Sequence, residues 1–130
     1  MYRFLKTKRL LYWVRKRQLS VPKLFVRNAV AHPQRIALRF ESQTWTFAQL
    51  DSYSNRVANA ALSVGLKPGD EVALLMSNRP EYIGIWLGLA KAGIVTALIN
   101  NQQRAAGLLH SISVINCKMV IFDTEHAQGV

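Results

Sequence analysis

Residues 70–101, DEVALLMSNRPEYIGIWLGLAKAGIVTALINN, decide the fold of this chain. Two apolar runs, Val72–Met76 and Ile94–Ile99, have the composition of strands that are covered on both faces. Between them, Pro80 suits the first turn of a helix and Gly93 suits its end. The order of strand, helix and strand predicts a βαβ unit with parallel strands and a right-handed crossover.

The helix inside this unit carries three further expectations. Ser77 or Asn78 is expected to cap it, because short polar side chains accept hydrogen bonds from the first free N–H groups. Gly84 and Gly88 are expected to let the helix approach the sheet closely, rather than to serve a membrane role. Trp86 stands among apolar residues, so we expect it in the core.

The segment before this unit predicts a β-hairpin and a helix. Ile36–Phe40 and Thr44–Thr46 have the pattern of a short antiparallel strand pair. Thr46 and Gln49 then have the spacing of a capping box, and the helix that it starts should end at Gly65.

The segment after the unit predicts a helix over roughly 105–115 and a strand over Lys118–Phe122. The complete order predicts an α/β fold: an open, mostly parallel sheet with flanking helices and an N-terminal β-hairpin. Ligands of such sheets bind beyond the carboxyl ends of the strands. Those ends are Ser77–Arg79, Asn100–Asn101 and Asp123–Thr124.

Positive charge is concentrated at the start of the chain. Eleven of the 17 Lys and Arg residues precede Glu41, and no acidic residue does. From Glu41 onward, six Lys and Arg residues face seven acidic ones, so the formal net charge of +10 belongs to the first 40 residues. A basic arm on a neutral domain indicates an acidic partner, such as a membrane, a nucleic acid or an import receptor.

Residues 1–20 are interpreted as a basic, membrane-proximal lead-in, and residues 21–130 as the folded part. Apolar and aromatic side chains stand between two cationic clusters in the lead-in, a composition that suits an interfacial segment. Val21-Pro22 is expected to break any helix before a short one over Lys23–Ala31. The expected membrane contacts are Lys6, Lys8, Arg9, Trp13, Arg15, Lys16 and Arg17.

Other interpretations of the lead-in stay open. An ordinary solvated helix, or an internal piece of a longer protein, has the same composition. A mitochondrial presequence is disfavoured by the few serines and by apolar and basic side chains that fall all round a helical wheel. Nucleic-acid binding follows from charge alone, but the aromatic residues are not spaced along a strand, so we expect no nucleic-acid partner.

Most catalytic and metal-binding patterns are missing from the sequence. The glycines stand singly, so neither a P-loop nor a GxGxxG pattern occurs, and His32, His110 and His126 lack the spacing of metal ligands. The single cysteine, Cys117, excludes an internal disulfide and favours a reducing compartment. No segment reaches the roughly 18 apolar residues that a membrane-spanning helix needs.

Arg79 has the best position for contact with a ligand. It stands at a helix N-terminus and at the carboxyl end of a strand, where an anion can bind. The alternative is an ion pair with a nearby acid, or simple solvation of the guanidinium. The sequence does not decide between these interpretations.

Two segments carry a specific family resemblance. TWTFAQLDSYSNRVANA (Thr44–Ala60) and NRPEYIGIWLGLAKAGIVTALINN (Asn78–Asn101) resemble the fatty acid transport proteins, also called very long-chain acyl-CoA synthetases. That family belongs to the adenylate-forming superfamily. The resemblance spans nearly the whole chain, from the basic lead-in to the VIFDTE strand at Val120–Glu125.

The resemblance implies a ligase activity for the full-length enzyme. Members convert a long-chain fatty acid and ATP to an acyl-adenylate and pyrophosphate, and coenzyme A then takes the acyl group. The reaction needs Mg²⁺ and is coupled to fatty acid uptake. The resemblance further implies association with an anionic membrane surface, on the cytoplasmic face of the endoplasmic reticulum or plasma membrane. It leaves the oligomeric state open.

The family's catalytic signatures do not occur between Met1 and Val130. They are a Ser/Thr/Gly-rich phosphate loop ending in Pro-Lys, an adenine- and ribose-binding segment, and a C-terminal catalytic lysine. No catalytic, cofactor-binding or metal-binding residue is therefore assigned. The positions that match family motifs are expected to be scaffold: Asn78, Glu81, Trp86, Gly88, Gly93 and Asn100.

We therefore expect the N-terminal portion of a long-chain fatty acid–CoA ligase, with a partial AMP-binding domain and no activity by itself. The alternative is a truncated, non-catalytic α/β binding module that its basic arm brings to a membrane.

Overall fold

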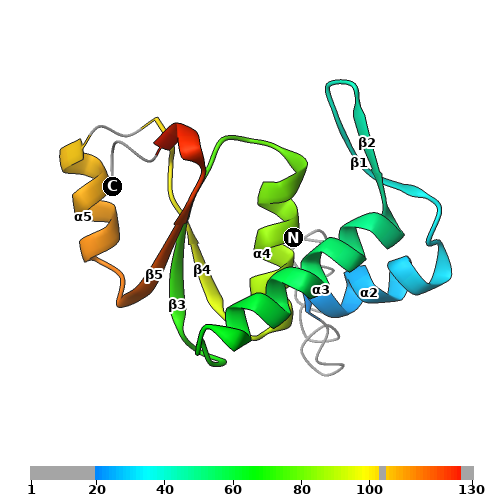
Figure 1. Ribbon diagram of the computed structural model, residues 1–130, viewed down its shortest axis with the longest axis horizontal. Helices are drawn as coiled ribbons and strands as arrows, with labels where there is room; N and C mark the ends of the chain where they lie inside the picture. Colours follow the sequence, from blue (N-terminus) through cyan, green and yellow to red (C-terminus); the bar gives the residue numbers. More distant parts are fainter. Residues whose placement is uncertain (1–19, 103–104, 127–130) are drawn as a thin grey trace, which may run out of the picture.

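The computed structural model describes residues 20–102 and 105–126. The predicted α/β class, with a parallel sheet, flanking helices and a hairpin, is confirmed (Figure 1). The elements are α2 (Val21–Ala31), β1 (Ile36–Phe40), β2 (Gln43–Thr46), α3 (Phe47–Ser63), β3 (Glu71–Leu75), α4 (Pro80–Lys91), β4 (Val95–Leu98), α5 (Ala105–Ser113), β5 (Cys117–Phe122) and the 3₁₀ turn η1 (Thr124–His126).

The parallel sheet has three strands in the order β4-β3-β5. Val72 at the centre of the sheet pairs with Thr96 on one side and Met119 on the other. Because β3 is flanked by strands and covered on both faces, Val72, Ala73 and Leu74 are completely buried. The βαβ unit predicted from the two apolar runs is therefore present, with β3 and β4 parallel.

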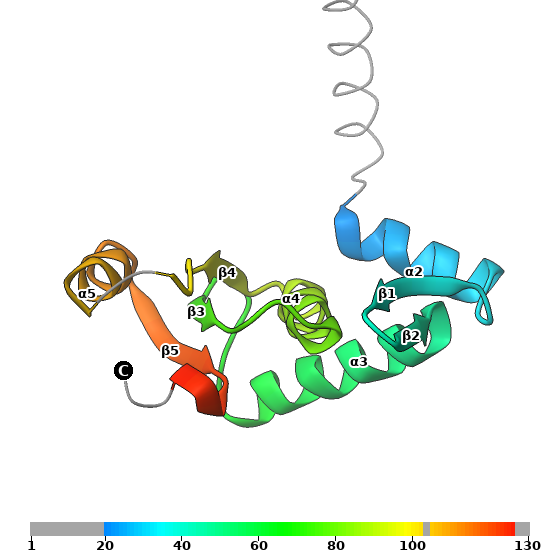
Figure 2. The ribbon, with the colours of Figure 1, turned by 90° about the horizontal axis from the view of Figure 1, so that it is seen from above.

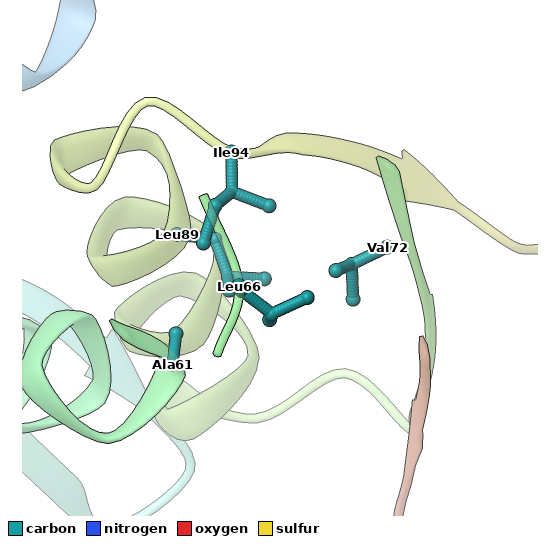
Figure 3. Close-up of a cluster of buried hydrophobic side chains, with 5 residues drawn as sticks. All are labelled: Ala61, Leu66, Val72, Leu89 and Ile94. Carbon is teal, nitrogen blue, oxygen red and sulfur yellow. The ribbon is translucent and has the colours of Figure 1, made fainter. Parts of the chain in front are cut away.

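Helices cover both faces of this sheet. Figure 1 shows α5 on one side of the strands and α4 with α3 on the other. Successive residues of β3 point to opposite faces, so Val72 packs in one cluster and Ala73 in the other. Figure 3 shows the first cluster: Ala61, Leu66, Val72, Leu89 and Ile94. The second cluster lies under α5: Ala73, Leu75, Ile99 and Leu108.

The hairpin forms a separate antiparallel sheet of two strands. Its turn is tighter than predicted, because Gln43 already belongs to β2 and Glu41 adopts a positive φ of 51°. Trp45 packs edge-on against Tyr53, with 5.3 Å between ring centroids, and so joins the hairpin to α3.

The starts of α2 and α3 show how local sequence places helix ends. Thr46 and Gln49 form the predicted capping box. The backbone N–H of Gln49 donates to Thr46 Oγ1 at 3.2 Å, and the backbone N–H of Thr46 donates to Gln49 Oε1 at 2.8 Å. The short helix predicted over Lys23–Ala31 is present as α2 and begins two residues earlier, at Val21. The predicted break of a preceding helix concerns residues 1–19, which lie outside the described residues. Ser20 is the N-cap and Pro22 lies in the first turn of α2, where a missing N–H costs little.

The two glycines of α4 face a helix rather than the sheet, so the prediction of a helix–sheet contact is wrong. A Cβ atom at Gly88 would lie 2.6 Å from the Ser54 carbonyl oxygen and 2.6 Å from Val57 Cβ. A Cβ atom at Gly84 would overlap the Tyr53 ring. The missing side chains therefore allow α3 and α4 to pack closely, and this contact fixes α3 on the outer face of α4.

Trp86 also differs from its prediction. It is only half-buried and belongs to neither of the two buried clusters. Position 86 is on α4, whose buried residues are Pro80, Gly84, Leu87, Gly88 and Leu89. Trp86 is not among them, so its ring does not take part in the core.

Candidate functional site

The carboxyl ends of the parallel strands meet at one edge of the sheet, as predicted. Ser77 follows β3 and Asp123 follows β5. The backbone N–H of Ser77 donates to Asp123 Oδ2 at 2.9 Å. The end of β4 joins them, because Asn101 Nδ2 donates to the Met76 carbonyl oxygen at 3.5 Å. Ligands of open α/β sheets bind at this edge, so it is the first place to look for a site.

Arg79 lies at this edge, and two carboxylates surround it. Its Nη2 lies 3.1 Å from Asp123 Oδ2 and 3.3 Å from Glu125 Oε1. Ser77 Oγ donates to Glu125 Oε2 at 3.0 Å, which fixes the second carboxylate. The Asp123 side chain is 5% exposed, so its charge requires a partner. We call this group the Arg79 cluster: Ser77, Arg79, Asp123 and Glu125.

Of the two interpretations of Arg79, the structure supports the ion pair. The positive charge of a guanidinium that already faces two carboxylates is compensated, so it attracts an external anion only weakly. The Arg79 cluster instead ties β3, α4 and η1 together across residues that are 44 to 48 positions apart in the sequence.

The N-terminus of α4 lacks the predicted cap. Arg79 is the N-cap and its side chain makes no capping hydrogen bond. Ser77 is engaged with Glu125, so the prediction that Ser77 or Asn78 caps the helix is wrong. Pro80 lies in the first turn, as expected. Glu81 lies there too, and its carboxylate complements the positive end of the helix dipole.

A cleft of about 220 Å³ lies beside the Arg79 cluster, between β1 and the first turn of α4. Burial raises the pKa of the Tyr82 phenol there, so the hydroxyl stays protonated and can donate a hydrogen bond at neutral pH. The lining residues are Leu38, Arg39, Phe40, Asn78, Arg79, Pro80, Tyr82 and Ile83. Such a lining can bind and orient a small polar ligand.

A wider, open cleft of about 460 Å³ lies between the hairpin and α3. Arg56 lies 5.5 Å from the Tyr53 ring centroid and donates to Ser52 Oγ at 3.1 Å. The pKa of Tyr53 is raised, first by burial and then by the Glu81 carboxylate. The lining residues are Thr44, Trp45, Ala48, Gln49, Ser52, Tyr53 and Arg56.

No group of three or more His, Cys, Asp or Glu residues that could hold a metal ion occurs in the described part of the chain. His32 and His110 are exposed and lie on different elements. Cys117 is half-buried, and its Sγ donates to the Met119 carbonyl oxygen at 2.8 Å. Within residues 20–102 and 105–126, no helix has the length and hydropathy needed to cross a bilayer.

The predicted membrane contacts remain a prediction. All of them fall within residues 1–19, outside the described residues. They are Lys6, Lys8, Arg9, Trp13, Arg15, Lys16 and Arg17.

The sequence did not predict one polar cluster, which surrounds the Lys91 ammonium. Lys91 Nζ lies between α3 and α4, 2.7 Å from Asp51 Oδ1, 2.7 Å from Ser54 Oγ and 2.8 Å from Asn55 Oδ1. Its ammonium also lies 5.5 Å from the ring centroid of Phe25 on α2. The available signal was Ser54, a polar residue on the otherwise apolar face of α3. We call this group the Lys91 cluster: Asp51, Ser54, Asn55 and Lys91.

Comparison with known proteins gives consistent matches. The family model described as "AMP-binding enzyme" matches residues 25–130. Long-chain fatty acid transport protein 1 of Rattus norvegicus is 45% identical over 113 residues, which are 85% of this chain and 18% of that protein. The medium/long-chain-fatty-acid–CoA ligase FadD6 of Mycobacterium tuberculosis is 27% identical over 111 residues.

A solved structure agrees with these matches. The inhibitor-bound N-terminal domain of FACL13 from Mycobacterium tuberculosis superposes with a TM-score of 0.78 at 30% identity, over 82% of this chain and 27% of that one. The chain thus spans about a fifth of the length of the curated relatives it matches, 18% for the rat protein.

Proposed function

Because the chain belongs to the AMP-binding enzyme family, we propose that it is the N-terminal region of a long-chain fatty acid–CoA ligase of the fatty acid transport type. The observation that carries this proposal is the 45% identity to rat long-chain fatty acid transport protein 1 over 85% of the chain. The similarity to an N-terminal domain in the FACL13 structure supports the same placement.

The proposed reaction belongs to the whole protein. A long-chain fatty acid and ATP give an acyl-adenylate and pyrophosphate, and coenzyme A then accepts the acyl group, with Mg²⁺ as the metal. We propose that this activation is coupled to fatty acid uptake. The matched region supplies scaffold: β3, β4, β5 and their covering helices.

The described residues do not themselves fit ATP or Mg²⁺. Arg79, the best-placed cation, is already paired with Asp123 and Glu125, and those carboxylates are in turn engaged. The sequence offers no glycine-rich phosphate loop, since its glycines stand singly. We therefore assign no catalytic step to this chain and expect it to form no acyl-CoA by itself.

A domain exchange tests the ligase proposal. The 113 matched residues of rat long-chain fatty acid transport protein 1 are replaced by the corresponding residues of this chain. We expect the chimera to form oleoyl-CoA from oleate, coenzyme A and ATP at a rate within about tenfold of the parent, because scaffold at this identity preserves packing. The chain alone, assayed in parallel, should give no oleoyl-CoA.

Two outcomes would contradict the proposal. A chimera that melts cooperatively at the parent temperature but forms no acyl-adenylate would favour the alternative, a non-catalytic α/β binding module. Turnover of oleate by the purified chain alone would show that the catalytic residues lie in this chain after all.

We further propose two functional segments: residues 1–20 as a membrane-proximal lead-in and residues 21–130 as a partial AMP-binding domain. The support is the eleven Lys and Arg residues before Glu41 with no acid among them. Each cation near an anionic leaflet adds about 1 kcal/mol. The proposed location is the cytoplasmic face of the endoplasmic reticulum or plasma membrane. Vesicle binding that deletion of residues 1–20 leaves undiminished would contradict the role of the lead-in.

A further inference from the structure

Helix α2 has one face against the protein and one face in solvent. On the inner face, the Phe25 ring lies 5.6 Å from the Phe47 ring and Ala29 is buried. At 100° per residue, the opposite face carries Lys23, Leu24, Arg27 and Val30, all of them exposed. Leu24 is 40% exposed and Val30 is 77% exposed. The outward face of α2, defined by these four residues, therefore mixes two cations with two bare aliphatic side chains.

The surroundings of this face are cationic and apolar as well. Between positions 20 and 40 the chain has Lys23, Arg27, Arg35 and Arg39 and no acidic residue. The same stretch contributes other exposed apolar side chains to the surface: Val21, Val26 and Ile36. Figure 2 shows α2 beside the hairpin at the periphery of the molecule, far from the three-stranded sheet. Nothing in the described structure covers the outward face of α2.

We propose that the outward face of α2 binds the surface of an anionic lipid bilayer. Lys and Arg contact acidic headgroups there, while Leu24 and Val30 enter the boundary between headgroups and acyl chains. The proposal extends the membrane contact suggested for residues 1–20 to a folded element. Because α2 follows the lead-in directly in the sequence, both can engage the same leaflet.

Charge and hydrophobicity together select this occupant. A second copy of the chain would bring two acid-free cationic faces together, which repel each other. A nucleic acid would satisfy Arg27 but would leave Leu24 and Val30 against phosphates, with no apolar partner. A bilayer with acidic headgroups offers both partners at one surface.

Vesicle flotation of the whole 130-residue chain tests the inference, because aggregates sink while vesicle-bound protein floats. Arg27→Gln should lower partitioning into phosphatidylcholine–phosphatidylserine vesicles about fivefold, whereas Lys67→Gln should change it less than twofold. Both variants remove one exposed cation, but Lys67 lies in the loop after α3, at the end remote from α2. Binding of the unmodified chain should weaken as salt rises, and pure phosphatidylcholine should bind it poorly.

A second matched pair tests the apolar part of the face. Val30→Ser should reduce partitioning severalfold, and Val64→Ser, at a position that is 62% exposed beyond the end of α3, should leave it unchanged. Both side chains are exposed, so both variants should keep the melting temperature of the parent. Circular dichroism melting confirms that each variant is folded.

Four results would overturn the inference. In the first, Arg27→Gln and Lys67→Gln weaken flotation equally, which shows an effect of net charge alone. In the second, Val30→Ser matches the parent. In the third, the chain binds a duplex oligonucleotide and ignores phosphatidylserine, which identifies a nucleic-acid partner. If deletion of residues 1–20 abolishes flotation while the α2 variants do not, the lead-in proposal stands and this inference fails.

Discussion

The Lys91 cluster and the Arg79 cluster both join segments that are distant in the sequence, but they differ in their exposure to water. The Lys91 side chain is only 11% exposed, between two helices that pack through glycine. The Arg79 side chain is 34% exposed and its partner Glu125 is 64% exposed. The cation of the first cluster is thus enclosed by packing, although its partner Asp51 is 27% exposed. The cation of the second cluster lies at the open edge of the sheet, although its partner Asp123 is buried.

This difference shows which cluster specifies the fold. Removing one partner of a buried charged group leaves the other unsatisfied and costs several kcal/mol. An ion pair in contact with water contributes at most about 1 kcal/mol. The Lys91 cluster should therefore determine how α3 and α4 fit together. The Arg79 cluster should position η1 without dominating stability.

The largest expected effect comes from the glycine contact beside the Lys91 cluster. Gly88→Ala places a Cβ atom against the Ser54 carbonyl oxygen and should destabilise the fold by about 2–3 kcal/mol. The matched control is Gly107→Ala, at an exposed position of α5, which should stabilise by up to about 1 kcal/mol. Urea unfolding midpoints measure both. Equal effects of the two substitutions would show that α3 and α4 are not in tight contact.

The next effect tests the enclosed cation itself. Lys91→Met removes the ammonium that donates to Asp51 Oδ1 and Ser54 Oγ, at a cost of about 2 kcal/mol. The cost stays below that of an isolated buried pair, because the Asp51 side chain is 27% exposed and its carboxylate keeps the hydrogen bond from Asn55 Nδ2. Lys67→Met, on an exposed loop, should change stability by less than about 0.5 kcal/mol. A Lys91→Met variant as stable as the parent would remove the basis for the comparison between the clusters.

A smaller effect is expected at the sheet edge. Arg79→Met should cost about 1 kcal/mol at low ionic strength, because the guanidinium is partly exposed and the buried Asp123 carboxylate keeps the hydrogen bond from the Ser77 backbone N–H. Added salt screens this pair, so the cost should shrink in potassium chloride, whereas the cost of Lys91→Met should persist. Denaturant melts at two salt concentrations separate the clusters. Identical salt dependence of the two variants would break the comparison.

The predictable parts of the molecule are those that local sequence controls. The two apolar runs, the Thr46–Gln49 capping box and the helix end at Gly93 each depend on residues a few positions apart. Their prediction was correct because each signal has a single local partner. The meeting of strand ends at Ser77 and Asp123 was also predictable, since it follows from parallel pairing alone.

The errors concern contacts across long sequence separations. Gly84 and Gly88 correctly indicated that another element packs closely against α4. A small residue does not indicate which element that is, and here it is α3 rather than the sheet. Lys91 was missed because its acceptors lie 36 to 40 residues away on α3. The choice between a ligand and an ion pair at Arg79 depended on Glu125, whose position after β5 only the fold defines.

The smallest effect is expected at the opposite end of the strands, where the cation of the pair, Lys118, is 55% exposed and thus more exposed than Arg79. Lys118 Nζ lies 2.6 Å from Asp70 Oδ1, and the Lys67 backbone N–H donates to Asp70 Oδ2 at 2.8 Å. The hydrogen bond from Lys118, and then that from Lys67, lower the pKa of Asp70 below its ordinary value of 3.8. The folded state therefore binds this proton less readily than the unfolded state, so the carboxylate stabilises the fold above the ordinary pKa. That contribution is lost as the pH falls through the lowered pKa.

The Asp70→Asn variant should accordingly have a slightly lower melting temperature than the parent at neutral pH, and the same melting temperature in strong acid. Thermal melts across this pH range measure the difference. A difference in melting temperature that stays constant across the titration would show that geometry, not charge, stabilises this end of the strands.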